Sequence, residues 1–264
     1  MDWWPAYLAI GAAVGFLAGL LGIGGGMVMV PMLVFVFRAK EFPGEHLMHL
    51  ALATGLATVV FTSASSVRAH NRYGAVEWPI VRTMAPGMMF GAFCAALAAG
   101  FAPTRPLAIF FSLFLLYAAT QMFLDIKPRA GRKLPRPGGL FFAGAAIGGF
   151  STLLAAGGAF LSIPFLTWCN VALKRAIGTA AANGFPIALA GSVGYVIQGL
   201  RAEGLPPGSF GYVYLPAFGF IVVMSMLTAP LGARLTHRLP VKRLRLVFAL
   251  ILYALGLRML ALVW

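Results

Sequence analysis

The 264-residue chain is strongly apolar and basic: 61% of its residues are hydrophobic, 10% are charged, and the formal net charge is +14 at pH 7. Soluble domains are about 45–50% apolar and about 25% charged, so this composition excludes an ordinary soluble domain and predicts a polytopic membrane protein. An excess of lysine and arginine is typical of cytoplasmic loops and of contact with anionic lipid. We therefore expect the lipid bilayer as a partner and no nucleic acid.

Apolar segments follow one another along the whole chain. A membrane-crossing helix needs about 20 mainly apolar residues. The first segment, 5–37, and a later one, 139–169, are longer than a single crossing requires. Six segments of ordinary crossing length are predicted over 47–67, 79–101, 106–125, 176–199, 211–233 and 246–263.

Glycine clusters interrupt both long segments. The first contains Gly24-Gly25-Gly26 followed by Pro31, and the second contains Gly157-Gly158 followed by Pro164. Glycine destabilises a helix interior and permits tight turns. Paired interruptions in the two halves of a membrane protein point to the binding site of a transporter.

The two halves of the chain share one order of features. Besides the glycines and prolines, Ala53-Thr54 matches Gly178-Thr179 at the start of the next span. We therefore predict a duplication, with a first membrane repeat over 5–125, a basic cytoplasmic linker over 126–138 and a second membrane repeat over 139–264.

Positive charge decides between two topologies. If each long segment crosses the membrane once, the loops on the two sides carry nine and ten lysines and arginines. If each long segment folds back at its glycines, one side carries fifteen lysines and arginines and the other four; Arg258 is left out of both counts. Because cytoplasmic loops concentrate positive charge, the sequence favours folding back, with both termini outside the cytoplasm. The expected fold class is an all-α polytopic membrane protein with two inverted repeats, each a glycine-broken, hairpin-like helix pair plus three transmembrane helices.

Backbone groups at the two interruptions are expected to bind an anion. A helix N-terminus presents free N–H groups and a positive dipole end, which bind an anion without a charged side chain. The alternative is that the glycines serve only close helix packing. The substrate-binding residues expected here are Gly24, Gly25, Gly26, Met27, Gly157, Gly158 and Ala159.

Polar side chains of the spans that follow the interruptions are expected to line the same cavity. Thr54 and Thr58 stand one helical turn apart in the first copy, and Thr179 and Asn183 do so in the second. The alternative for a threonine is a hydrogen bond back to its own helix. Hydroxyl and amide donors suit a sulfur or phosphorus oxyanion that must be released again.

Two further residues have alternative interpretations. Arg258, deep in the last span, is either a snorkelling charge at the interface or a cavity cation that attracts the anion. His49 is expected at a solvated loop end, with a part in proton coupling as its alternative. The spans contain no Ser/His or Asp/Asp pair and no metal-binding spacing, so we expect neither an enzyme nor a cofactor or metal.

The first glycine motif, its second copy and the next span together resemble the sulfite exporter TauE/SafE family of bacterial membrane permeases. The motifs that carry this resemblance are Gly19-Leu20-Leu21-Gly22-Ile23-Gly24-Gly25-Gly26 with Pro31, Gly157-Gly158 with Pro164, and Ala176-Ile177-Gly178-Thr179. The resemblance extends from about Val14 to Leu260. The second copy departs from the pattern, since it has two glycines and carries Ala180 where a serine is common.

This resemblance implies a secondary transporter, in particular an exporter, of sulfite, an organosulfonate or a similar small sulfur-containing oxyanion. It also implies a multi-pass protein of the bacterial inner membrane, driven by a gradient of a coupling ion (H⁺ or Na⁺). A monomer and a homodimer both remain open for the oligomeric state. The alternatives are an anion-selective channel and an uptake permease for another small anion.

Overall fold

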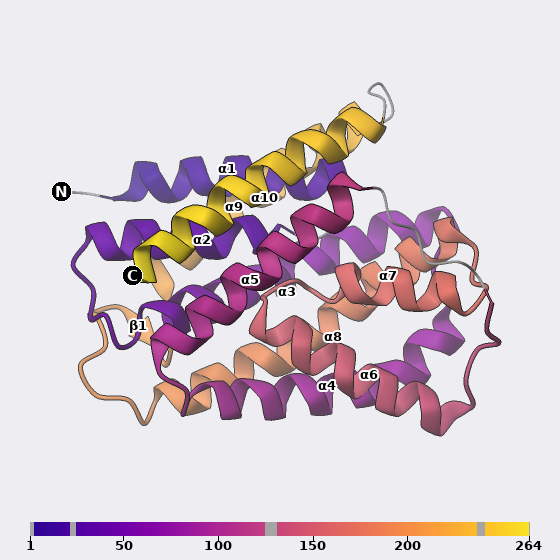
Figure 1. The fold of residues 1–264 in the computed structure, drawn as a ribbon, viewed down its shortest axis with the longest axis horizontal. Helices are drawn as coiled ribbons and strands as arrows, with labels where there is room; N and C mark the ends of the chain where they lie inside the picture. The colour runs from indigo at the N-terminus through magenta and orange to yellow at the C-terminus, as the bar shows by residue number, and fades with distance from the viewer. Residues whose placement is uncertain (1–2, 22–24, 125–130, 237–240, 264) are drawn as a thin grey trace.

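Helices make up nearly all the regular structure of this protein. The computed structural model describes residues 3–21, 25–124, 131–236 and 241–263. Within these ranges the chain forms ten helices and one short hairpin (Figure 1). In chain order the elements are α1 (Trp4–Leu21), α2 (Gly26–Ala39), α3 (Leu47–Arg72), α4 (Trp78–Ala99), α5 (Thr104–Phe123), α6 (Pro137–Leu153), α7 (Ala159–Trp168), α8 (Leu173–Gly199), β1 (Ser209–Phe210), β2 (Val213–Tyr214), α9 (Leu215–Thr236) and α10 (Val241–Val263).

Five of the described helices are long and apolar enough to cross a membrane. They are α3, α4, α5, α8 and the part of α9 from Leu215 to Gly232. Large apolar side chains are exposed on several helices, among them Phe90, Leu113, Phe142 and Leu250. Such surfaces are unfavourable in water and favourable in hydrocarbon. The prediction of an all-α polytopic membrane protein is confirmed.

The two long apolar segments are divided where the sequence has its glycine clusters. Helix α1 ends at Leu21 and α2 begins at Gly26, while α6 ends at Leu153 and α7 begins at Ala159. Figure 1 shows that α1 and α2 run in opposite directions, as do α6 and α7. The α1–α2 pair opens toward the end of the bundle where the chain begins, and the α6–α7 pair opens toward the other end.

Small residues bring the outer helices close together. Helix α1 packs on α9, and α4 packs on α6. A Cβ atom on Gly15 would overlap Ser225 in the first pair, and a Cβ atom on Gly91 would overlap the carbonyl of Ala145 in the second. Glycine is used here for close backbone approach, the role that small residues have in membrane helix packing.

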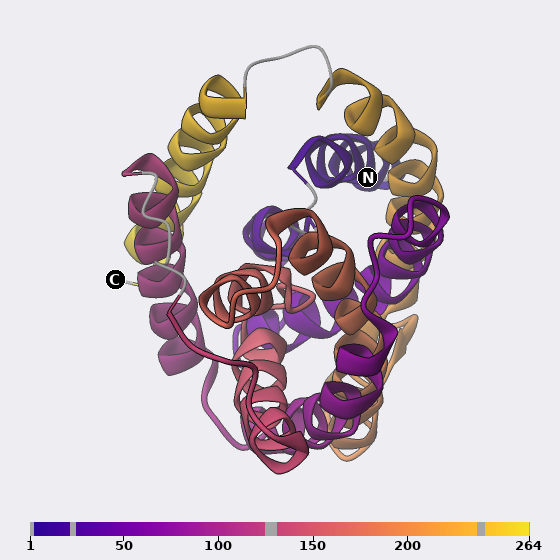
Figure 2. The same ribbon diagram turned by 90° about the vertical axis from the view of Figure 1, so that its right-hand side faces the viewer.

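The short helices α2 and α7 lie toward the middle of the bundle. Figure 2 looks nearly along the helices and shows the α1–α9, α4–α6 and α5–α10 pairs around them. Helix α2 packs on α3, α7 packs on α8, and α3 and α8 pack on each other. The residues of α2 from Gly26 to Pro31 are all buried. These four helices form the interior in which the glycine breaks meet.

One predicted span begins later than expected. The span predicted from residue 211 begins at Leu215, because residues 209–214 form the β1–β2 hairpin, in which Ser209 pairs with Tyr214 and Phe210 with Val213. The sequence carries a short hairpin signal, Gly211-Tyr212 between β-forming residues, but this signal is weaker than the apolar pattern of the segment that follows.

The basic segment between the predicted repeats is described only in part. Residues 126–130 lie outside the described residues. The amides of Gly131 and Arg132 donate hydrogen bonds to the carbonyl of Trp168, at the end of α7. Both chain ends lie at the same end of the bundle in Figure 1. The division into two repeats and the side on which the termini lie stay predictions.

Candidate functional site

The second break is a tight turn that ends in the N-terminus of α7. The amides of Leu154 and Ala156 both donate to the carbonyl of Ser151, which closes the end of α6. Gly157 and Gly158 follow with φ angles of 58° and 78°. Glycine is required at these two positions because other residues rarely adopt a positive φ. The chain then enters α7 with its first amides directed back toward the turn.

Several amides at this turn have no acceptor. Among the described residues, the N–H groups of Gly157, Gly158, Ala159 and Phe160 make no hydrogen bond, and the first amide of this helix to bond is that of Leu161. Gly158 is the N-cap residue of α7 and has no side chain to cap it. These free donors coincide with the positive end of the helix dipole. Such a terminus attracts an anion.

Four polar side chains near the second break are buried without partners. Asn183 has neither a donor nor an acceptor for its amide among the described residues, and the hydroxyls of Ser151, Thr152 and Ser162 are also unpartnered. All four residues are fully buried. A buried polar group without a hydrogen bond costs about 1–3 kcal/mol. These four groups are therefore available to bind a small polar ligand.

Packing places these side chains around the break. The Ser162 hydroxyl lies 3.7 Å from the position that a Cβ atom of Gly158 would take. Asn183 precedes Gly184 in α8, and a Cβ atom on Gly184 would lie 2.6 Å from the carbonyl oxygen of Gly157. Helix α8 thus packs against the turn that carries the free N–H groups, and its unpartnered Asn183 is the residue before this contact.

The first break touches the second. A Cβ atom on Gly26 would overlap the carbonyl oxygen of Ala155, so the start of α2 lies directly against the second turn. Gly25, the N-cap residue of α2, packs against α1, and Met27 is buried. Gly24, also expected in the site, lies outside the described residues. The two interruptions, both expected to bind the anion, are neighbours in the structure.

Thr54 and Thr179 have equivalent hydrogen bonds in the two halves. The hydroxyl oxygen of Thr54 accepts the amide of Tyr214 at 3.0 Å, immediately before α9 begins. The hydroxyl oxygen of Thr179 accepts the amide of Glu77 at 3.0 Å, immediately before α4 begins. Each threonine therefore holds the start of a helix from the other half, a partner that the sequence did not show. Their role as substrate ligands stays a prediction.

Two other expected site residues lie in different environments. The hydroxyl of Thr58 donates to the carbonyl of Thr54 at 2.9 Å, the bond within its own helix that was the alternative for it. Arg258 is exposed on α10. Sequence spacing did not single out Ser151, Thr152 and Ser162, although all three stand within six residues of the Gly157-Gly158 pair.

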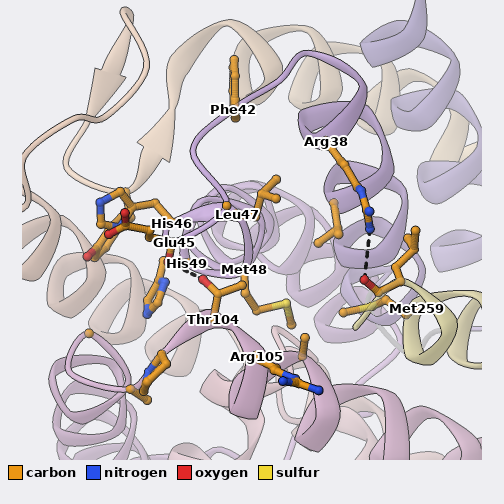
Figure 3. A pocket seen from close by; sticks show the side chains of 18 of the residues that line it. Arg38, Phe42, Glu45, His46, Leu47, Met48, His49, Thr104, Arg105 and Met259 are labelled. Atoms are coloured by element: carbon orange, nitrogen blue, oxygen red, sulfur yellow. Dashed lines mark hydrogen bonds between the residues drawn. The ribbon is translucent and has the colours of Figure 1, made fainter. Parts of the chain in front are cut away.

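A separate pocket opens at the end of the bundle where the chain begins. It has a volume of about 820 Å³. Figure 3 shows Arg38 from α2, His46 just before α3, His49 from α3 and Arg105 from α5 around it. The expectation that His49 is solvated is wrong, because its side chain is only 3% exposed. The ring is covered by Tyr212, which stacks on it at 4.9 Å between centroids.

Comparison with known proteins extends over nearly the whole chain. Residues 7–259 match the family model described as sulfite exporter TauE/SafE. The chain belongs to the TauE/SafE family. It is 37% identical to a protein of Haemophilus influenzae described as "Probable membrane transporter protein", over 96% of both chains.

More distant relatives carry the same description. A protein of Methanocaldococcus jannaschii is 28% identical over 97% of this chain and 95% of its own. A protein of Bacillus subtilis is 27% identical over 86% of this chain and 88% of its own. No solved structure matches the chain. Together with its apolar helices, these relatives show that this TauE/SafE protein is a multi-pass membrane transporter.

Proposed function

We propose that this transporter is a secondary exporter of a small sulfur-containing oxyanion, such as sulfite or an organosulfonate, in a bacterial inner membrane. The observation that carries the proposal is the group of unpartnered donors at the meeting point of the two breaks. Asn183 is fully buried and both polar atoms of its amide lack partners in the described part of the chain. The free amides of Gly158 and Ala159 lie at the turn against which Gly184, the next residue of α8, packs.

An oxyanion matches this set of donors. Each oxygen of a sulfite or sulfonate group accepts more than one hydrogen bond, so one small ligand can satisfy several amides and hydroxyls together. The sequence has no charged residue from 137 to 173 or from 3 to 37. Binding by neutral donors and a helix dipole is weaker than binding by a buried cation, which favours release on the other side of the membrane.

Alternating access between two inverted repeats is the mechanism we propose. Its support is the pairing of helices: α1 packs on α9 as α6 packs on α4, and α2 packs on α3 as α7 packs on α8. If each of α1–α5 is replaced by the helix five places later, and each of α6–α10 by the helix five places earlier, these same pairs of helices are in contact. Transporters with such repeats rock one part against the other around a central site.

A basic side chain makes a polar contact next to each of the two threonine junctions, one at each end of the bundle. Next to the Thr54 junction, the Lys40 ammonium donates to the Tyr214 hydroxyl at 2.9 Å. Next to the Thr179 junction, Arg175 forms an ion pair with Glu77. In the proposed cycle these pairs close the two sides of the site and open in alternation.

Anion flux in proteoliposomes tests the proposed function. The full-length protein should carry labelled sulfite or an alkanesulfonate with saturable kinetics. In the Asn183→Leu variant flux should fall by at least about tenfold. Its thermal stability in detergent should stay equal or rise, because an unpartnered buried amide is replaced by an apolar side chain of similar size.

A matched control separates substrate binding from folding. Ser112 is fully buried in α5, and its hydroxyl bonds to the carbonyl of Ala108 in its own helix at 2.7 Å. The Ser112→Ala variant should keep its flux. Absence of flux with every anion tried would overturn the proposal, and so would an Asn183→Leu variant that transports at the wild-type rate.

A further inference from the structure

We propose that His49 is the binding site of the coupling proton, and that it takes up this proton when an anion occupies the pocket beside it. This inference rests on the proposed anion transport, and it identifies the proton as the ion to which that transport is coupled. The site is the pocket of about 820 Å³ between α2, α3, α5 and the hairpin (Figure 3).

The hydrogen bond of His49 determines which ring nitrogen is free. The Nε2 atom lies 2.9 Å from the carbonyl oxygen of Ala99, at the end of α4. A carbonyl oxygen only accepts, so Nε2 carries the hydrogen and donates it. In the neutral ring the lone pair is then on Nδ1. Nδ1 is buried and has no partner among the described residues.

The surroundings of the ring keep it neutral until a counter-ion arrives. Tyr212 covers one side of the ring and is itself buried, which raises the pKa of its phenol and keeps it uncharged. His46 stands 6.4 Å away between ring centroids, and its Nε2 lies 3.1 Å from the carbonyl oxygen of Glu203. None of these neighbours supplies a negative charge in contact with the His49 ring.

The charged groups around the pocket favour an anion. Those that line it are Arg38 from α2, Arg105 from α5 and Glu45 from the loop before α3. Arg38 donates one of its N–H groups to the carbonyl of Leu262 at 3.0 Å, which positions the guanidinium at the pocket wall (Figure 3). An ion pair is required before a charge is stable at a buried position. An anion in the pocket therefore makes protonation of Nδ1 favourable, and the proton makes the anion bind more tightly.

Contacts connect this pocket to the glycine breaks. Tyr212, stacked on His49, is two residues before Tyr214, whose amide is held by the hydroxyl of Thr54. Gly55, the next residue of α3, lies beside Ala155 of the second break. If protonation of His49 shifts the hairpin, the shift acts through Thr54 on α3, the helix that packs against the second break. This gives proton binding a direct structural connection to transport.

Calorimetry of anion binding tests the inference on the full-length protein in detergent. Isethionate is the probe, because a sulfonate does not titrate near neutral pH. The titration is carried out at pH 6.5 in two buffers with different enthalpies of ionisation. We expect the apparent heats to differ by an amount that corresponds to close to one proton taken up for each anion bound. The affinity should weaken with rising pH, by as much as about tenfold per pH unit, as linkage to one proton requires.

His49→Gln is the decisive variant, since its side-chain amide can still donate to the Ala99 carbonyl and cannot take up a proton. It should bind isethionate without proton uptake, whereas the control His46→Gln should retain the uptake. Equal heats in the two buffers for the wild-type protein would overturn the inference, as would uptake that survives in His49→Gln. Equal heats for the wild-type protein overturn the inference whether or not His49→Gln folds, and uptake that is lost in a folded His49→Gln variant assigns the proton to His49.

The outcomes also separate this inference from the proposed function. Binding without proton uptake leaves anion transport in place and removes the role of His49. Absence of isethionate binding in the wild-type protein, together with absence of sulfite binding, overturns both.

Discussion

A single methyl group on Gly184 tests whether the turn at the second break must hold its position. A Cβ atom at this residue would lie 2.6 Å from the carbonyl oxygen of Gly157, a distance that real Cβ atoms do not show. The obstacle is backbone, so the turn itself has to move. Gly55 is the matched control: it faces the same break from α3, and a Cβ atom there would lie 3.3 Å from Val30 and 3.5 Å from Ala155.

Both substitutions gain stability from the higher helix propensity of alanine. They differ in the cost of packing the added methyl group. Replacing glycine by alanine inside a helix stabilises it by about 0.5–1 kcal/mol. Overpacking at Gly184 costs about 1–3 kcal/mol, whereas the contacts around Gly55 can accommodate a methyl group with a small adjustment. We expect Gly55→Ala to be neutral or stabilising, and Gly184→Ala to be less stable than Gly55→Ala by about 1–3 kcal/mol.

Thermal unfolding in detergent and anion flux in proteoliposomes measure the two consequences. A difference of this size lowers the melting temperature by about 2–4 °C for each kcal/mol. Flux should fall in Gly184→Ala, because the displaced turn carries the free amides of Gly157 and Gly158. The reasoning is refuted if both alanine variants have equal stability and equal flux.

Three more substitutions test individual contacts. Gly26→Ala would place a methyl group on the carbonyl of Ala155 and should destabilise the protein by about 1–3 kcal/mol in thermal unfolding; unchanged stability would mean that the breaks are not in contact. Ala155→Gly should keep or raise the melting temperature, because the alanine has a φ of 47° that glycine adopts without strain, and a clear loss would contradict this. Thr179→Val leaves the amide of Glu77 without its acceptor and should cost about 1–3 kcal/mol. Thr58→Val, which removes only a bond within one helix, should have a smaller effect, and equal effects would refute the assignment.

Much of the fold could be predicted because membrane helices leave a strong signal in composition. Long apolar runs predicted a helix in each of the six ordinary segments, and five of these helices are long and apolar enough to cross a membrane, since hydrocarbon accepts no unpaired backbone and requires about 20 apolar residues per crossing. The glycine clusters predicted the ends of α1 and α6, because glycine combines poor helix stability with access to positive φ. The β1–β2 hairpin was missed, since two short apolar strands look like the beginning of a helix.

The site was harder to predict because partners come from distant parts of the chain. Thr54 and Thr179 were selected for their repeat positions, yet their hydroxyls accept amides from residues more than one hundred positions away. Nothing in the local sequence distinguishes a hydroxyl that holds a helix start from one that faces a cavity. Asn183 shows the opposite case, since it was selected by the same spacing and has no protein partner among the described residues.

The two halves differ in the residue that stands one helical turn after the shared threonine. Both keep a threonine that holds the start of a helix from the other half. At the next turn the first half has Thr58, bonded within its own helix, and the second has Asn183, fully buried and unpartnered in the described structure. A scaffold duplicated for symmetry needs equivalent junctions, whereas one small ligand at the centre needs only one set of donors. Under the proposed duplication, the unpartnered polar groups belong to one half because one ligand needs one set of donors, and Asn183, rather than its counterpart Thr58, is the residue on which anion binding should depend.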